Sequence, residues 1–412
     1  MGLSCESQRA RVYSLVETLM SRSSVAFVIA VAIVTASPAS SQARSDEIEQ
    51  QKDDKAAVIE PPTRENGDRI VTALEHVFVP EPPSIAPTFG DFRPGAGLAF
   101  GVASVVPVGE RGTWRTSTAW SLEDFKQIES VVDVPPFATD HVHVKAFVKW
   151  DNAPELSFFG LGADSKPANE VGYGLDSTDA GAELRVGGPR GFRYGAGASY
   201  LSASSRDAIE LPTVSGLSAA AAPGFGSSPE WWHLTTFAAF DTRHSPGHTD
   251  SGGLYSVRLH DYIDRDDVFD FRRTEIDLRQ FVPILHDNWI IALQARADLA
   301  SPANGQLVPF FMRPAIGGRD TLPGFANDRF IDNDSLLLRS ELRWTASPLV
   351  DMAVFVDQGT VAPTAGALSV TDLKRGWGIG ARFHGDDFTA LRIEVAHSIE
   401  GWRYNIARGV SF

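Results

Sequence analysis

Apolar and polar residues alternate along most of the chain after residue 95. At the C-terminal end, Leu391, Ile393 and Val395 occupy every second position, with Arg392 and Glu394 between them. Successive side chains of a β-strand point to opposite faces, so this period of two predicts strands with one apolar and one charged face. Clusters of Gly, Asp, Asn and Pro separate the alternating segments, as expected for turns. The pattern predicts an all-β protein.

The alternating segments predict sixteen antiparallel strands. They lie near residues 96–107, 112–122, 125–134, 141–151, 170–177, 179–188, 191–203, 230–242, 252–262, 268–282, 286–301, 335–347, 349–358, 375–385, 388–398 and 402–412. An even number of strands places both ends of the sheet on one side of a membrane. The three long connections, 205–229, 302–334 and 359–374, then lie together on the other side.

Strands of this kind suit either a soluble sandwich or a membrane barrel. The two folds turn the apolar face of the sheet in opposite directions. A sandwich buries that face in a core, whereas a transmembrane barrel turns it toward lipid and lines its lumen with polar groups. Aromatic residues such as Trp150, Trp377 and Trp402 cluster at strand ends, where the two membrane interfaces would lie. Arginine recurs on the polar face. We therefore predict a transmembrane β-barrel, with a secreted sandwich as the alternative.

Composition divides the chain into three parts. Residues 1–43 contain Arg22, an apolar run at 25–36 and small residues before Ala43, which predicts a secretory signal peptide. Residues 44–94 are charged and Pro-rich and predict a periplasmic linker or plug segment, and residues 95–412 predict the barrel. The single cysteine, Cys5, lies in the predicted signal peptide, which excludes thiol chemistry after cleavage. A net charge of −15 argues against nucleic acid as a partner.

The connection from 301 to 334 is too long to be an ordinary turn. It contains Phe310, Phe311, Leu322, Phe325 and Phe330, which favours packing over disorder. We expect it to fold into the polar lumen; an extracellular cap with a few buried aromatic residues is the alternative.

Several motifs in order resemble the bacterial surface antigen family. They are Gly317-Gly318, then Leu322-Pro323-Gly324-Phe325, RSELRW at 339–344, VFVDQG at 354–359, LRIEVAHSIEG at 391–401 and the terminal GVSF, with FFGLGADS at 158–165 as a further similar segment. This superfamily includes the barrel subunit of the outer-membrane assembly machinery and the two-partner secretion transporters. The resemblance covers residues 95–412.

The resemblance implies a sixteen-stranded barrel whose long sixth extracellular loop is folded into the lumen. There the family's Arg-Gly-Phe or Arg-Gly-Tyr motif meets acidic residues of nearby strands, but this chain has Pro323-Gly324-Phe325. We expect Arg319 or Arg329 to supply the missing charge and Glu341 or Asp357 to accept it, because a buried guanidinium must be paired.

The terminal Phe412 resembles the C-terminal signal of barrel clients. We expect its ring at the periplasmic interface, with the last strand paired to the first.

No catalytic, cofactor or metal residues are predicted. A Gly-x-Ser-x-Gly nucleophile turn is absent from the sequence, and His233, His244, His248 and His260 lack regular ligand spacing. Residues 44–94 are too few for even one polypeptide-transport-associated domain. The favoured function is a non-enzymatic protein of the bacterial outer membrane that assists insertion or transport of polypeptides, with lipids and client polypeptides as partners. A passive solute pore and an outer-membrane barrel enzyme are the alternatives.

Overall fold

The computed structural model describes residues 83–412, apart from 91, 92, 94, 136–140, 189–190, 285–287, 348 and 386–387. The predicted signal peptide at 1–43 and most of the predicted linker at 44–94 lie outside the described residues. Apart from residues 369–372, the described residues belong to one compact unit. No helix among them is long and apolar enough to cross a membrane.

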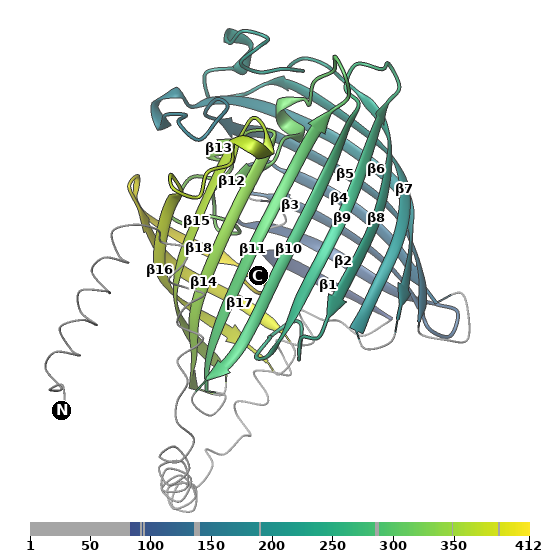
Figure 1. Ribbon diagram of the computed structural model, residues 1–412. Helices are drawn as coiled ribbons and strands as arrows, with labels where there is room; N and C mark the ends of the chain where they lie inside the picture. Colours follow the sequence, from purple (N-terminus) through teal and green to yellow (C-terminus); the bar gives the residue numbers. More distant parts are fainter. Residues whose placement is uncertain are drawn as a thin grey trace, which may run out of the picture. The chain divides into compact units, whose positions relative to one another are not determined.

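Sixteen strands form one antiparallel sheet in which each strand pairs with the next (Figure 1). They are β1 (Ser84–Gly90), β2 (Ala99–Val108), β3 (Gly112–Ser121), β4 (Lys126–Val134), β5 (Val142–Phe158), β6 (Val171–Gly187), β7 (Phe192–Asp207), β8 (Glu230–Asp241), β9 (Gly252–Asp264), β10 (Phe271–Ile284), β11 (Trp289–Pro302), β14 (Asp334–Ser347), β15 (Val350–Ala362), β16 (Lys374–His384), β17 (Thr389–Ser398) and β18 (Gly401–Ala407). Between β11 and β14, the short strands β12 (Ala315–Ile316) and β13 (Phe330–Ile331) pair with each other.

The predicted number of strands is correct, but two of the predicted strands are wrong. Strand β1 lies inside the segment predicted as a Pro-rich linker. It contains Pro87, and proline is tolerated at the edge of a sheet, where β1 lies. The strands predicted at 170–177 and 179–188 are the single strand β6. Asp179 and Gly181, directly after the predicted break at residue 178, pair with Leu201 and Ser199 of β7, so the ladder is continuous there. The two errors cancel in the count.

The exposed face of the sheet is the apolar one. In β17 and β18, Ile393 is 40% exposed and Ile406 is 64% exposed, whereas the exposed fractions of Arg392 and Glu394 are 1% and 2%. A soluble sandwich would bury the apolar residues and expose the charged ones. The secreted sandwich considered from the sequence is therefore wrong, and the sheet has the polarity of a membrane barrel.

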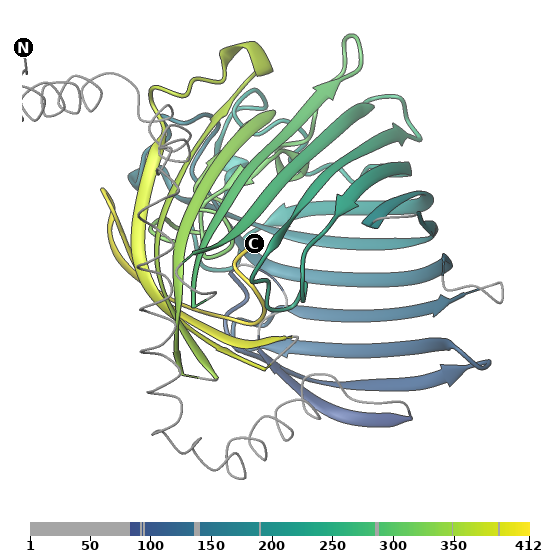
Figure 2. The ribbon, with the colours of Figure 1, turned by 60° about the horizontal axis from the view of Figure 1, so that its bottom comes forward.

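The sheet curls around an interior, and the C-terminus lies inside the curve (Figures 1 and 2). Within the described residues no ladder joins β1 to β18, so both strands are edges of the sheet. A cavity of about 930 Å³ lies against the inner faces of β3–β11 and is lined by charged residues that include Glu183, Arg258 and Asp277. An apolar core around Phe158, Trp231 and Phe310 closes over the inner face at the end that carries the long connections.

The polarity of the sheet predicts how a charge on its outer face acts. Ile379, on β16, is 52% exposed. Lysine there should destabilise the protein in phospholipid vesicles by about 2–4 kcal/mol if this face meets the bilayer core. Urea unfolding followed by gel migration without boiling measures the loss, and Ile379→Leu is the control. A water-exposed face would tolerate the same lysine within about 0.5 kcal/mol.

Candidate functional site

The inner face of β14–β17 carries a chain of buried ion pairs that begins on β14. Arg339, Glu341 and Arg343 occupy alternate positions of β14 and so share one face, and each is at most 4% exposed. The sheet register places Arg339 directly opposite Asp357 of β15. The Arg339 guanidinium donates to that carboxylate at 3.1 Å (Nε to Oδ1), and Arg343 donates to Glu341 at 3.0 Å (Nε to Oε1).

The chain continues onto β16 and β17. Arg382 donates to both Glu341 and Glu394, and Arg392 lies 3.4 Å from Glu394 (Nε to Oε1). The register sets Arg382 opposite Arg392, so Glu394 bridges two like charges. Gly380 leaves the necessary space, because a Cβ there would lie 2.6 Å from Nη1 of Arg382 and 2.8 Å from Cγ of Glu394.

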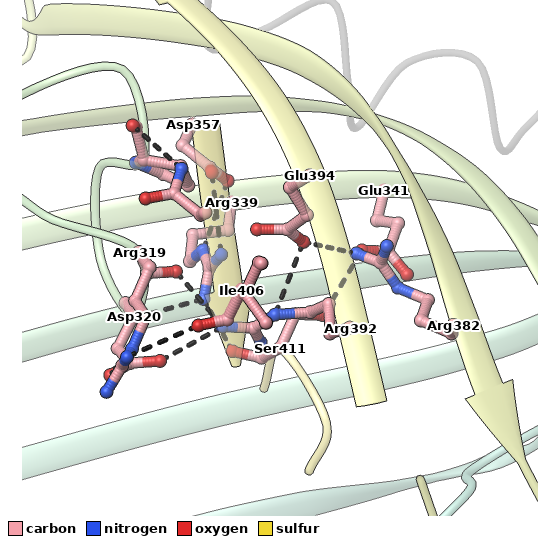
Figure 3. Close-up of polar contacts among 12 residues, drawn as sticks. Arg319, Asp320, Arg339, Glu341, Asp357, Arg382, Arg392, Glu394, Ile406 and Ser411 are labelled. Atoms are coloured by element: carbon pink, nitrogen blue, oxygen red, sulfur yellow. Dashed lines mark hydrogen bonds and ion pairs between the residues drawn. The ribbon is translucent and has the colours of Figure 1, made fainter. Parts of the chain in front are cut away.

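The connection between β11 and β14, residues 303–333, supplies a further acid to this network (Figure 3). On the strands, four arginines (Arg339, Arg343, Arg382, Arg392) meet three acids (Glu341, Asp357, Glu394). Asp320 of the connection accepts from Arg392 at 3.0 Å (Oδ1 to Nη2), and its backbone carbonyl accepts from Arg339 at 3.2 Å. The Asp320 carboxylate thus gives the fourth strand arginine an acid, and it also pairs with Arg319 of the connection.

The predicted motif residues of the connection lie on the same inner face. Ser398 of β17 donates to the Gly324 carbonyl at 2.6 Å, and Asn405 of β18 donates to the Pro323 carbonyl at 3.1 Å. A Cβ at Gly324 would lie 2.9 Å from the His397 carbonyl oxygen, so glycine allows this close approach. Phe325 is buried and packs edge-on against Phe330.

Two glycines shape the turn that carries these residues. Gly317 and Gly318 have φ angles of 130° and 84°, which non-glycine residues rarely adopt. A Cβ at Gly317 would lie 2.3 Å from the Ala326 carbonyl oxygen. The Gly317 N–H donates to Oγ1 of Thr321 at 2.8 Å, which closes the turn.

Arg329 fastens the other side of the connection. Its side chain is 2% exposed and donates to Glu400, between β17 and β18, at 2.8 Å (Nε to Oε1). The same guanidinium donates to Oγ and the carbonyl of Ser165, in the connection between β5 and β6. It lies over the rings of Phe159 and Phe330, at 4.7 and 4.6 Å from their centroids. The FFGLGADS segment and the long connection therefore meet at Arg329.

The contacts between the connection and the strands differ from the predicted ion pairs. Arg329 pairs with Glu400 rather than with Glu341 or Asp357, and arginines of the strands pair with both of those acids. Arg319 contacts Asp320 and the Ile406 carbonyl. The prediction placed the arginine in the connection and the acid in a strand. In the structure Asp320 of the connection is the acid, and Arg392 of β17 is the arginine. The polar faces of these strands carry more arginines than acids. This excess is the sequence feature that indicates an acid supplied from outside the strands, which is Asp320.

Burial shifts the pKa values of three groups in the connection. It raises the pKa of the Asp328 carboxyl, an effect that Arg93 opposes. It raises the pKa of Asp332, although the Asn333 N–H and Arg313, 3.5 Å away, oppose the rise, and it lowers the pKa of Arg313. A carboxyl whose pKa is raised on folding stabilises the folded state below its unfolded pKa, and this contribution is lost as the pH rises through the folded pKa.

The C-terminal residues do not form the strand that was predicted to end at Phe412. Strand β18 ends at Ala407, and Phe412 is 5% exposed among Phe281, Ile290 and Ala292 of β10 and β11. The predicted position of its ring at an interface and the predicted pairing with the first strand are both wrong. Two hydrogen bonds hold the C-terminal residues on the inner face. Arg339 donates to the Ser411 carbonyl at 2.6 Å, and the Ser411 hydroxyl donates to Glu341 at 3.1 Å.

Removing the acid of the connection should loosen it. Asp320→Ala leaves Arg392, 1% exposed, with Glu394 as its remaining acid. Since the Asp320 side chain is half exposed, the expected loss is about 1–3 kcal/mol, between the values for surface and buried pairs. Urea unfolding and protease cleavage within 303–333 measure it. A double-mutant cycle with Arg392→Ala should show coupling, whereas a cycle with Arg343→Ala, whose side chain contacts Glu341 and the Thr249 carbonyl, should show little; equal coupling would contradict this assignment.

Because Phe412 packs in a buried apolar site, the stability lost on replacing it should depend on the size of the new side chain. Phe412→Ala should destabilise the protein by about 3 kcal/mol, because it empties a buried ring site. Phe412→Leu keeps most of the apolar volume and should cost less than half as much in the same urea assay. If instead both variants unfold like the unmodified chain but fail to reach the outer membrane, the ring acts as a targeting signal rather than in packing.

Comparison with known proteins gives the same architecture. No protein-family model and no curated protein sequence matches the chain. Among solved structures, BamA from Haemophilus ducreyi lacking POTRA domains 1–3 aligns with a TM-score of 0.59 and 14% identity, over 79% of this chain and 68% of that one. CdiB from Acinetobacter baumannii aligns with a TM-score of 0.50 and 14% identity, over 79% of this chain and 59% of its own. CdiB from Escherichia coli aligns with a TM-score of 0.51 and 12% identity, over 80% of this chain and 61% of the CdiB chain. The chain therefore shares its fold with BamA and CdiB, as its sequence motifs predict.

Proposed function

We propose that the protein is a bacterial outer-membrane barrel that assists the insertion or transport of polypeptides. The observation that carries the proposal is a pair of unpartnered strand edges in a fold shared with BamA and CdiB. Within the described residues, β2–β17 have a neighbour on both sides, whereas β1 and β18 have one each. An open strand edge presents unpaired N–H and C=O groups that a client strand can use.

The two edges differ from the rest of the sheet. Both strands have only seven residues, whereas β5 and β6 have seventeen each. Pro87 removes one backbone donor from β1, and the chain leaves the sheet after Ala407. Few ladder hydrogen bonds could close such short strands, so the seam between them is the weakest place in the sheet and the place where a client would enter.

In this proposal the 303–333 connection is an extracellular loop folded into the lumen. It is the sixth connection at its end of the sheet, counted along the order of the strands. Asp320, Gly324 and Arg329 attach it to β17 and the turn that follows it, beside the β18 edge. Two further contacts, from Asn405 to the Pro323 carbonyl and from Arg319 to the Ile406 carbonyl, reach β18 itself, so the loop stiffens this side of the seam. Lipids of the outer membrane cover the apolar face.

Passage of small solutes is the second candidate function. It is favoured by the 930 Å³ cavity, whose charged lining would keep it hydrated. We further propose that the protein is not an enzyme, since the charged residues of β14–β17 pair with one another and the sequence lacks a nucleophile turn. Channel conductance in a planar bilayer without any effect on client proteins would favour the solute pore.

Photo-crosslinking at the sheet edge tests the proposal. A benzophenone amino acid at Tyr404 of β18, 80% exposed, should capture polypeptides in cells that are synthesising outer-membrane proteins. The same amino acid at Trp377 of β16, 49% exposed but with paired strands on both sides, is the matched control and should capture few. Equal capture at both positions, or none at Tyr404, would contradict a client-binding edge.

A further inference from the structure

The connection between β8 and β9, residues 242–251, reaches across to strands far away in the sheet. Thr389 of β17 donates to the Gly247 carbonyl at 3.0 Å, and Arg343 of β14 donates to the Thr249 carbonyl at 3.0 Å. Thr249 is 1% exposed. These contacts place His248, between the two anchored residues, against the ends of β15 and β16.

His248 meets Asp351 and His384 there. Nε2 of His248 lies 3.4 Å from Oδ2 of Asp351, and Nε2 of His384 lies 3.4 Å from Oδ1 of the same carboxylate. One candidate ligand atom from each residue lies within 4.8 Å of the others. In the part of the chain that the structure describes, no other group of three or more His, Cys, Asp or Glu residues meets this criterion.

Several polar atoms of this cluster have no hydrogen-bond partner among the described residues. Asp351 is 0% exposed, yet neither of its carboxylate oxygens has a hydrogen-bond partner among the described residues. Nε2 of His384 is also without one, while its Nδ1 lies 2.9 Å from the Gly385 carbonyl. If Nδ1–H donates to that carbonyl, Nε2 carries the lone pair, as in metal-binding histidines oriented by a backbone acceptor. A buried carboxylate without hydrogen bonds is costly unless a cation completes it.

The donor set selects the class of cation. Two imidazole nitrogens and one carboxylate oxygen suit Zn²⁺ and related divalent transition metals, whereas Mg²⁺ and Ca²⁺ prefer oxygen ligands alone. Ligands about 2.0–2.2 Å from a tetrahedral ion lie roughly 3.4 Å apart. Each histidine Nε2 lies at this distance from one carboxylate oxygen of Asp351, although not from the same one. The imidazole rings now stack, 3.6 Å between centroids, so binding requires one ring to turn until both lone pairs point at the ion.

We propose that His248, Asp351 and His384 form a binding site for a divalent transition metal of the zinc class. The ion takes three protein ligands and leaves a fourth position for water. Since the ligands come from the β8–β9 connection, β15 and β16, the ion ties that connection to strands on the other side of β10–β14. Local spacing of histidines in the sequence could not reveal the site, because two of its ligands lie more than a hundred residues beyond His248.

Zinc binding to the purified, folded barrel tests the site. The full chain, without a histidine tag, is stripped with a chelator in detergent, titrated with Zn²⁺ and dialysed, and the metal content is measured by mass spectrometry. We expect one Zn²⁺ per chain and a higher temperature for the gel-mobility transition, with no response to Mg²⁺. His248→Ala and His384→Ala should each weaken binding at least about tenfold.

His244→Ala is the matched control, because His244 lies in the same connection but is largely exposed and pairs with Asp250. It should bind Zn²⁺ like the unmodified chain. Asp351→Asn, which keeps the shape of the side chain, guards against a folding defect in the alanine variants. The proposal is overturned if the unmodified chain retains no Zn²⁺, or if the His248 and His384 variants retain as much as His244→Ala.

Discussion

The arrangement of the interior depends on one electrostatic constraint: arginines buried on the inner face of β14–β17 must each have an acid. Removing a guanidinium from water is tolerable only with a matched counter-charge and good hydrogen bonds. The strands provide Glu341, Asp357 and Glu394 for four arginines, and the fourth acid comes from Asp320 of the 303–333 connection. The connection therefore belongs to the same electrostatic unit as the sheet.

The C-terminal residues belong to this unit as well. Arg339 contacts Asp357, the Asp320 carbonyl and the Ser411 carbonyl, so one guanidinium holds a strand, the connection and the tail. Its side chain also lies over the Phe412 ring, 5.0 Å from the centroid. A change at any of these three segments must alter the surroundings of Arg339. This coupling of connection and tail lies beside the edge strand β18, which our proposal assigns to client binding.

The alternation of residues predicts the class of the fold and the polarity of its faces, because period two and side-chain chemistry are local properties. It fails at β1, an edge strand inside the segment predicted as a Pro-rich linker, and at β6, which was divided at residue 178 although the strand is continuous. The motif residues Pro323 and Gly324 contact β18 and β17. The charged pairs could not be predicted from the sequence, since pairing depends on the register between strands: Arg339 faces Asp357 only because β14 and β15 align as they do. The inward path of Phe412 depends on contacts with β10 and β14 that no local pattern encodes.

The central claim is that the 303–333 connection lies on the polar inner face of a membrane barrel. Ser398, 4% exposed beneath Gly324, can be replaced by cysteine with little change in size, and Ser218, exposed in the connection between β7 and β8, serves as the reference. Both variants would carry Cys5→Ser. A membrane-impermeant maleimide added to intact cells should label Ser218→Cys but not Ser398→Cys until the protein is unfolded. Equal labelling of the two cysteines in intact cells would contradict the account.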